Sequence, residues 1–494
     1  MTYDALPPRR LGTAAARRGQ DGIPGPTGNF DTPCSLFVNG ARIHLGPAGQ
    51  RRARRGCVSS VGGHVRILCA GDLHLGRRSS RVPWEGDGAA GSCAEAWMRL
   101  VECAIRERVD LVALSGDLVD HDNRWFEAFG PLERGLKHLA NAGIPVYSVA
   151  GNHDYDTLPH LARTIDAGNF HLLGEGGSWE RATIVRDGRP VLHIDGWSFP
   201  AERVTASPLP DYPRRPHDGV RVLGLLHADL DQPGSRYCPV ALADLHQTPV
   251  DIWLLGHIHA PALHERPGCP LVLYPGSVQA MDPGETGVRG AWIVTLTSGS
   301  RPEPRCVPLS TVRYESLEVD LTGATDEDEA RSRVVAAIRA ALQEAATDAG
   351  PLTHLCCRVR LTGRTPLHRT LGGIARGFEE EFSLADTSGR VTAFVERVTI
   401  DTRPAIDLRA LATAPHPAGE VARLLLALDG EADPPPEYRP LIDRTVSALR
   451  TVADHRWYRD IAGDPAPDAA LARRYLVQEG WRLLDTLLQE RGEA

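Results

Sequence analysis

Residues 65–74 read VRILCAGDLH, a short apolar run that ends in an aspartate and a histidine. Further apolar runs follow between residues 110 and 276: DLVALSG, PVYSVAG, VRVLGLLHA, DIWLLGH and LVLYPG. Stretches with helical spacing alternate with them, and this alternation is typical of an α/β fold whose strands are buried. We therefore expect an α/β core that begins at Val65 and includes GAWIVTL at 290–296 as its last strand.

The composition indicates an ordinary globular protein. The chain has 494 residues, of which 42% are hydrophobic and 24% charged, and it is long enough for about three domains. A net charge of -8 argues against a protein that coats nucleic acid nonspecifically, although it allows a local basic track beside a metal site. The ten cysteines include no C-x-x-C pair, and the sequence has neither a secretory apolar region nor a membrane-spanning run. We expect a cytoplasmic protein that does not contact a membrane.

Changes in composition and hydrophobic pattern divide the chain into four predicted parts. Residues 1–64 hold nine arginines, three aspartates and neither lysine nor glutamate, and we expect a flexible extension there. This extension could be a solvated tail, a nucleic-acid arm, an organelle transit peptide or an over-long start of the reading frame. The α/β core is expected over 65–312 and a small α+β domain over 313–404. Residues 405–494 are expected to be helical.

The last helical stretch carries an apolar stripe. It consists of Val477, Trp481, Leu484 and Leu488, which fall on one face of a helix. Such a stripe is commonly a contact within the protein core. The alternative is a docking face for a partner, and we carry both forward.

Two acidic motifs follow the first two strands of the core. Asp72 and His74 come directly after VRILCA, and alternation along an extended chain would point both side chains the same way, as one divalent ion requires. Asp117 follows the strand DLVAL, where Gly116 lets the chain turn sharply. Each motif alone is weak, because a D-x-H triplet arises by chance and an aspartate after a strand often caps a turn.

The motif GNHDY at 151–155 is more specific. Asn152 can offer a carbonyl oxygen to a metal, His153 can reach a phosphate oxygen, and Asp154 can hold the His153 imidazole in one tautomer. An Asn-His-Asp cluster at the end of a strand has few purely structural uses. We therefore assign candidate catalytic roles to His153 and Asp154.

Three histidines follow two later strands. His227 ends the run LGLLH, and His257 and His259 form the motif GHIH. His227 alone could be a satisfied core residue. With the earlier motifs, however, the chain offers two aspartates, one asparagine and four histidines, a set of oxygen and nitrogen ligands for two ions such as manganese. The set contains no cysteine thiolate, which would have favoured a structural zinc site.

With these motifs the sequence resembles a known family, the calcineurin-like metallophosphoesterases. It is more narrowly similar to the SbcD-type DNA repair exonucleases and their YhaO-like members, through YCPVALADL at 237–245, YPGSVQAMDPGETGVRGAWIV at 274–294 and LTGRTPLHR at 361–369. The resemblance covers residues 65 to about 400. It implies a four-layer α/β/β/α sandwich, followed by a small α+β capping domain and a helical partner-binding region.

The resemblance also implies roles for the candidate residues. Each ion would have four ligands, with Asp117 shared: Asp72, His74, Asp117 and His259 for the first, and Asp117, Asn152, His227 and His257 for the second. His153 would stabilise charge on the phosphate or protonate the leaving oxygen, with Asp154 orienting it. The segment LVDHDNRWFE after Asp117 departs from the family pattern, since Asp120 falls on the familiar acidic position but His121 and Asp122 are added.

The function implied is hydrolysis of DNA by water activated between two divalent ions, with manganese expected. Three arginines beside the site, Arg77, Arg78 and Arg81, could contact DNA phosphates or lie in a solvated loop. Implied partners are DNA, a coiled-coil SbcC-like ATPase and a second copy of the chain, in DNA repair or defence. Two alternatives stay open: a phosphoesterase that acts on cyclic nucleotides or small phosphate esters, and a subunit that mainly binds DNA or the ATPase.

Overall fold

The structure is a computed structural model. It describes residues 64–84, 88–120, 126–213, 218–348, 350–429, 433–453 and 467–490, with the two strands at 34–38 and 41–45. By its internal contacts the chain divides into two units, Met1–Cys57 and Val58–Ala494, and we describe each by itself.

The first unit contains one described feature, a β-hairpin. Its strands β1 (Cys34–Val38) and β2 (Ala41–Leu45) pair antiparallel. The rest of the extension predicted for residues 1–64 lies outside the described residues, apart from His64.

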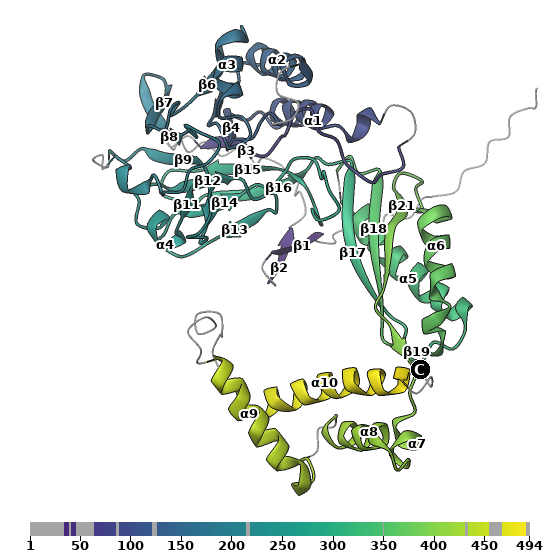
Figure 1. Ribbon diagram of the computed structural model, residues 1–494. Coiled ribbons are helices and arrows are strands. Elements are labelled where there is room, and N and C mark those ends of the chain that lie inside the picture. The colour runs from purple at the N-terminus through teal and green to yellow at the C-terminus, as the bar shows by residue number, and fades with distance from the viewer. Residues whose placement is uncertain are drawn as a thin grey trace, which may run out of the picture. The chain divides into compact units, whose positions relative to one another are not determined.

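Two six-stranded sheets form the centre of the second unit (Figure 1). The first sheet has the order β16-β15-β3-β4-β5-β6. Its strands are β3 (Val65–Ala70), β4 (Leu111–Leu114), β5 (Val146–Ser148), β6 (Phe170–Leu172), β15 (Gly290–Leu296) and β16 (Glu303–Pro308). The second sheet has the order β13-β14-β12-β9-β8-β7. Its strands are β7 (Glu180–Arg186), β8 (Arg189–Trp197), β9 (Arg221–His227), β12 (Ile252–Gly256), β13 (Ala262–His264) and β14 (Leu271–Tyr274).

The sheets pack face to face and each is covered on its outer side. Ile67 and Leu111 from the first sheet share one buried cluster with Leu223 and Leu254 from the second. Helices cover the outer face of the first sheet: α1 (Cys93–Arg106), α2 (Phe126–Asn141) and α3 (Thr157–Thr164). A thinner layer of loops covers the second, with the short helix α4 (Leu242–Leu245) and the two-residue strands β10 (Asp229–Leu230) and β11 (Pro239–Val240). The predicted α/β sandwich of metallophosphoesterase type is confirmed.

A smaller α+β sheet follows the sandwich. It has the order β17-β18-β21-β20. Its elements are β17 (Val312–Asp320), α5 (Glu327–Ala346), β18 (His354–Thr362), α6 (Leu371–Glu381), β20 (Ser383–Ala385) and β21 (Thr392–Ile400), with a small pair β19 (Arg364–Thr365) and β22 (Arg403–Pro404). Both helices pack on this sheet around their own buried cluster. We call residues 312–404 the capping sheet region.

The C-terminal helices are α7 (Leu408–Ala412), α8 (Pro417–Leu428), α9 (Arg439–Ala453) and α10 (Ala469–Glu490). The stripe on α10 packs inside this region, because Leu484 is 0% and Leu488 5% exposed in a cluster with residues of α8. Leu484 and Leu488 thus form the core contact that was one alternative for the stripe, while Val477 and Trp481 are half-buried against the same cluster. Docking of a partner on this region stays a prediction. Arg364 of β19 lies over the Trp481 ring and pairs with Asp485. None of the helices in the described residues is long and apolar enough to cross a bilayer.

Candidate metal centre

The ends of five strands bring seven polar side chains together. They follow β3, β4 and β5 of the first sheet and β9 and β12 of the second, at the carboxyl ends where α/β folds place ligands. Three sets of residues have ligand atoms that, within each set, lie within 4.8 Å of one another. The sets are Asp72, His74 and His259; Asp117, His227 and His257; and His74, Asp117 and His153. Asn152 joins the second set, because its Oδ1 lies 2.9 Å from His227 Nε2 and 3.1 Å from His257 Nδ1. The structure thus places all seven sequence-predicted ligands in one cluster.

The backbone at these residues differs from the expectation. Asp72, His74, Asp117 and His257 have φ angles of 51°, 44°, 52° and 91°. An extended chain with alternating side chains was therefore the wrong reason for grouping Asp72 with His74. Tight left-handed turns aim the side chains instead, and such turns cost about 1–3 kcal/mol each where the residue is not glycine. Backbone contacts between loops hold them, such as Asp72 N to Gly116 O at 3.1 Å and His74 N to Asp117 O at 3.0 Å.

Each cluster histidine uses one ring nitrogen for a partner outside the cluster. His74 Nδ1 lies 3.2 Å from Asp120 Oδ1, and His259 Nδ1 lies 2.7 Å from Glu285 Oε1. His227 Nδ1 contacts the Ser115 carbonyl at 3.0 Å, and Nε2 of the same ring is directed at the cluster. His257 is reversed.

In His257 the outer nitrogen is Nε2, which lies 3.4 Å from Asp229 Oδ1, while Nδ1 faces Asn152. Metal-binding histidines typically show this arrangement of one inward and one anchored nitrogen. Two further observations fit cations. His74 Nε2 faces His259 Nε2 at 3.1 Å, and the buried Asp72 Oδ2 has no hydrogen-bond partner among the described residues. The donor set therefore fits two divalent ions.

The electrostatics of the cluster favour an ionised Asp117. Burial alone would raise the pKa of this carboxyl, but the imidazoles of His227 and His74 hold its pKa below the usual range. The pKa of His227 responds in the opposite direction: burial lowers it, and the Asp117 carboxylate, 3.3 Å away, raises it to about 9. Asp117 is consequently available as an anionic ligand at neutral pH.

The predicted pairing of Asp154 with the His153 imidazole is corrected by the structure. Asp154 is fully buried, and its carboxylate accepts hydrogen bonds from backbone amides: Oδ1 from Gly151 N at 2.8 Å and Oδ2 from Leu118 N at 2.7 Å. Burial and the nearby Asp117 raise the Asp154 pKa to about 7. Asp154 therefore ties together the loops that follow β4 and β5.

The carboxylate that faces the His153 ring belongs to Asp120. Its Oδ1 lies 3.7 Å from His153 Nδ1, and burial lowers the pKa of His153. The His153 side chain is 35% exposed, whereas His74 beside it is 1% exposed. His153 thus lies at the open side of the cluster, where a substrate could meet it. His121 and Asp122, which interrupt the family pattern, lie outside the described residues.

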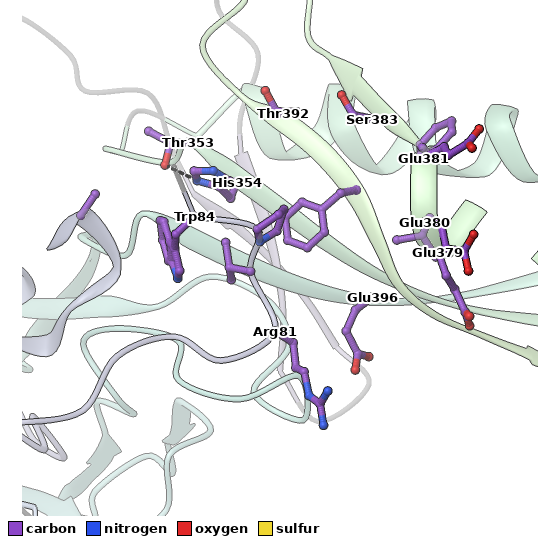
Figure 2. A pocket seen from close by; sticks show the side chains of 16 residues that line it. Arg81, Trp84, Thr353, His354, Glu379, Glu380, Glu381, Ser383, Thr392 and Glu396 are labelled. Carbon is purple, nitrogen blue, oxygen red and sulfur yellow. Dashed lines mark hydrogen bonds between the residues drawn. The ribbon is translucent and has the colours of Figure 1, made fainter. Parts of the chain in front are cut away.

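The three predicted DNA-contacting arginines have different surroundings. Arg77 donates to Asp282 Oδ2 at 2.6 Å, so its charge is paired. Arg78 and Arg81 are exposed, and Arg81 reaches the rim of a separate pocket of about 760 Å³ (Figure 2). That pocket lies beside the capping sheet region, and its acidic lining residues are Glu379, Glu380, Glu381 and Glu396. None of the seven ligand candidates lines it, and its carboxylates would repel a phosphate.

Sequence reasoning missed three carboxylates that anchor histidines: Asp120, Asp229 and Glu285. Asp120 had been noted for its position but given no role. Glu285 lies within the quoted stretch AMDPGETGVRG, which could have drawn attention to it. Asp229 stands two residues after His227 with no motif of its own. Only the folded chain brings it to the ring of His257.

Comparisons with known proteins agree with this geometry. Residues 65–261 match the family described as calcineurin-like phosphoesterase, and residues 314–403 match the middle domain of metallophosphoesterase YhaO. The chain is 34% identical over 205 residues to an uncharacterized metallophosphoesterase YhaO of Bacillus subtilis, across 40% of this chain and 48% of that protein.

A second curated relative is more distant. It is a DNA double-strand break repair protein Mre11 of Haloferax volcanii, 29% identical over 289 residues, across 55% of this chain and 58% of that protein. The chain thus spans about half the length of these curated relatives. Among solved structures, the calcineurin-like phosphoesterase YfkN of Bacillus subtilis aligns with a TM-score of 0.34 and 13% identity, over 50% of this chain and 91% of that one.

Proposed function

Residues 65–261 belong to the calcineurin-like phosphoesterases, and from this premise we propose that the protein is a metal-dependent phosphodiesterase that cleaves DNA. The observation that carries the proposal is the cluster of seven carboxylate, amide and imidazole side chains at the strand ends. Two divalent ions, with manganese proposed, would when bound neutralise the phosphodiester and lower the pKa of water.

The residues of the chain have separate tasks in this proposal. Asp117 would hold both ions, because its carboxylate lies near His74 of one group of ligands and His227 of the other. His153, at the open side of the cluster, donates to a phosphate oxygen or to the leaving oxygen. Asp120 faces the other side of that ring and keeps it aimed outward. Asp154 keeps the loops after β4 and β5 in register.

Two considerations support DNA as the substrate. A matched relative is named as a DNA double-strand break repair protein, and Arg77, Arg78 and Arg81 lie in the loop that follows His74. Arg78 and Arg81 are exposed, and surface arginines of this kind bind backbone phosphates. In this proposal Arg77, Arg78 and Arg81 guide a strand toward the metal centre. A coiled-coil ATPase of the SbcC type is the proposed protein partner, bound through residues 405–494.

The test compares substrates and metals. Purified protein is incubated with linear, hairpin and single-stranded DNA, and separately with bis-p-nitrophenyl phosphate, in Mn²⁺ or in EDTA. We expect Mn²⁺-dependent cleavage of DNA by the wild type and none by Asp117→Asn. Cleavage of the small diester alone would favour the small-ester alternative. Binding of DNA without hydrolysis of any substrate would favour the binding-subunit alternative.

A further inference from the structure

Glu285 lies 26 residues after His259 in the chain and contacts its ring. Glu285 Oε1 accepts from His259 Nδ1 at 2.7 Å, while Oε2 accepts from Ser277 Oγ and from Met281 N, both at 2.9 Å. The Glu285 side chain is only 12% exposed. The carboxylate is thus fixed from the protein side by two donors, and its remaining oxygen is directed at the imidazole.

The same segment also holds the backbone of His259. The His259 carbonyl accepts from Ser277 N at 3.0 Å and from Arg289 Nη1. Arg289 in turn donates to Thr286 O at 2.9 Å. Residues 277–289 therefore hold both the main chain and the ring of His259.

His259 needs such support more than its neighbours do. Its side chain is 26% exposed, whereas those of His227 and His74 are 0% and 1% exposed and are held by packing on all sides. Its ring contact with Glu285 is also shorter than the corresponding contact of His74 with Asp120, at 3.2 Å. A carboxylate that accepts from Nδ1 keeps the proton there and leaves the Nε2 lone pair free.

We infer that Glu285 is a positioning residue, which holds His259 in the tautomer and orientation that the metal centre requires. The inference rests on the proposed function, since it takes His259 as a ligand. It adds a residue outside the seven ligand candidates. It also assigns a task to the stretch AMDPGETGVRG, which the ligand assignment leaves without one.

The test measures metal affinity. Isothermal titration of the metal-free full chain with MnCl₂ is compared between the wild type, Glu285→Gln and the control Glu396→Gln. In Glu285→Gln the amide cannot accept from His259, Ser277 and Met281 together, because one of its two ends is a donor. Loss of such a partner typically weakens metal binding about 10- to 100-fold.

We expect that loss at one site of Glu285→Gln, with an unchanged melting temperature of the metal-free protein. Glu396 is a suitable control, because its side chain is 5% exposed and bonded to Arg358 but lies outside the metal cluster. Equal Mn²⁺ affinity in Glu285→Gln and the wild type would overturn the inference alone. A wild type that binds no Mn²⁺ would overturn the proposed function as well.

A second measurement does not depend on a variant that folds. The ¹⁵N shifts of the histidine rings in the metal-free wild type report which nitrogen carries the proton. For His259 we expect the proton on Nδ1. A neutral ring with its proton on Nε2 alone would overturn the inference, because Nδ1 would then not donate to Glu285.

Discussion

At the scale of single residues, backbone strain and side-chain chemistry coincide. Asp72, His74, Asp117 and His257 are all left-handed, and all four are candidate ligands. Strain of this kind persists where surrounding contacts over-determine the conformation, and it is concentrated at functional sites. Gly151 illustrates the crowding, since a Cβ there would lie 2.2 Å from Asp117 Oδ1. The loops therefore hold the cluster in place through strained and closely packed backbone.

Asp117→Ala is predicted to remove both ions. A carboxylate shared by two dications offsets the repulsion between them, and the other ligands cannot replace it. Metal analysis of the purified variant should give well under one ion per chain, whereas Asp166→Ala, an exposed aspartate, should keep the wild-type content. Two retained ions in Asp117→Ala would contradict the shared position.

His153→Ala is predicted to lower kcat about 10²- to 10⁴-fold on DNA, the usual range for a lost general acid, with little change in KM. Both ions should stay bound, because His153 is assigned to the substrate. A leaving group such as p-nitrophenolate needs less proton donation, so the loss should shrink on bis-p-nitrophenyl phosphate. Equal losses on both substrates would indicate charge stabilisation, and near-normal DNA cleavage would exclude His153 from the mechanism.

At the scale of elements, the loop after β3 meets the loop before β15. Asp282 accepts from Arg77 Nη2 at 2.6 Å and from Ser80 Oγ at 2.8 Å. The Asp282 side chain is 49% exposed, and exposed ion pairs contribute only about 0–1 kcal/mol. A DNA phosphate could therefore compete with Asp282 for Arg77 at little cost.

Asp282→Asn is predicted to tighten DNA binding up to about fivefold, the equivalent of ~1 kcal/mol, because it frees Arg77 from a competing carboxylate. Fluorescence anisotropy with a DNA hairpin in EDTA measures this without cleavage. Arg77→Ala should weaken binding, and Asp282→Asn should bring no gain when added to Arg77→Ala. If Asp282→Asn tightened DNA binding equally in the wild type and in Arg77→Ala, the gain in affinity would not come from Arg77.

Neighbouring leucines on α10 separate core from surface. Leu484 is 0% exposed and Leu483 is 51% exposed. Leu484→Ala should lower the free energy of unfolding of the C-terminal helices by about 2–5 kcal/mol, while Leu483→Ala should change it by less than about 0.5 kcal/mol. Native-state hydrogen exchange of the α10 amides measures both. If both substitutions changed the free energy of unfolding by similarly small amounts, Leu484 would not be a core residue.

At the scale of the whole molecule, the metal cluster and the C-terminal helices use different parts of the chain. The ligand candidates run from Asp72 to His259, and the segment that supports His259 ends at Arg289. The two buried clusters of the C-terminal helices begin only at Ile406. Arg364 and Arg403 of the capping sheet region form ion pairs with Asp485 of α10, and Arg364 also lies over the Trp481 ring.

A chain that ends at Pro404 is therefore predicted to keep Mn²⁺-dependent cleavage, since the deletion removes none of the cluster residues and leaves the β19–β22 pair intact. It should lose co-purification with the coiled-coil ATPase. Wild-type protein expressed with the same ATPase is the control. Retained co-purification would move the partner site into residues 65–404.

The sequence alone predicts the ligand types, their order along the chain and the buried strands that carry them, because apolar runs and short motifs are local properties. It also determined the separation of an α/β sandwich from a smaller sheet and a helical end, through changes in periodicity. Asp72, His74, Asp117, Asn152 and the three later histidines could all be named for that reason. Each stands directly after a recognisable strand.

The side chains that complete the site could not be predicted in this way, because their contacts join residues far apart in sequence. Asp120, Asp229 and Glu285 anchor ring nitrogens across loops, and no local pattern shows which ring each of them contacts. Asp154 was assigned to its sequence neighbour His153, yet the fold turns its carboxylate toward the amides of another loop. The sequence allowed the stripe on α10 to be either a core contact or a docking face. In the structure Leu484 and Leu488 of the stripe pack against α8, and burial of apolar surface within the chain stabilises the fold without a partner.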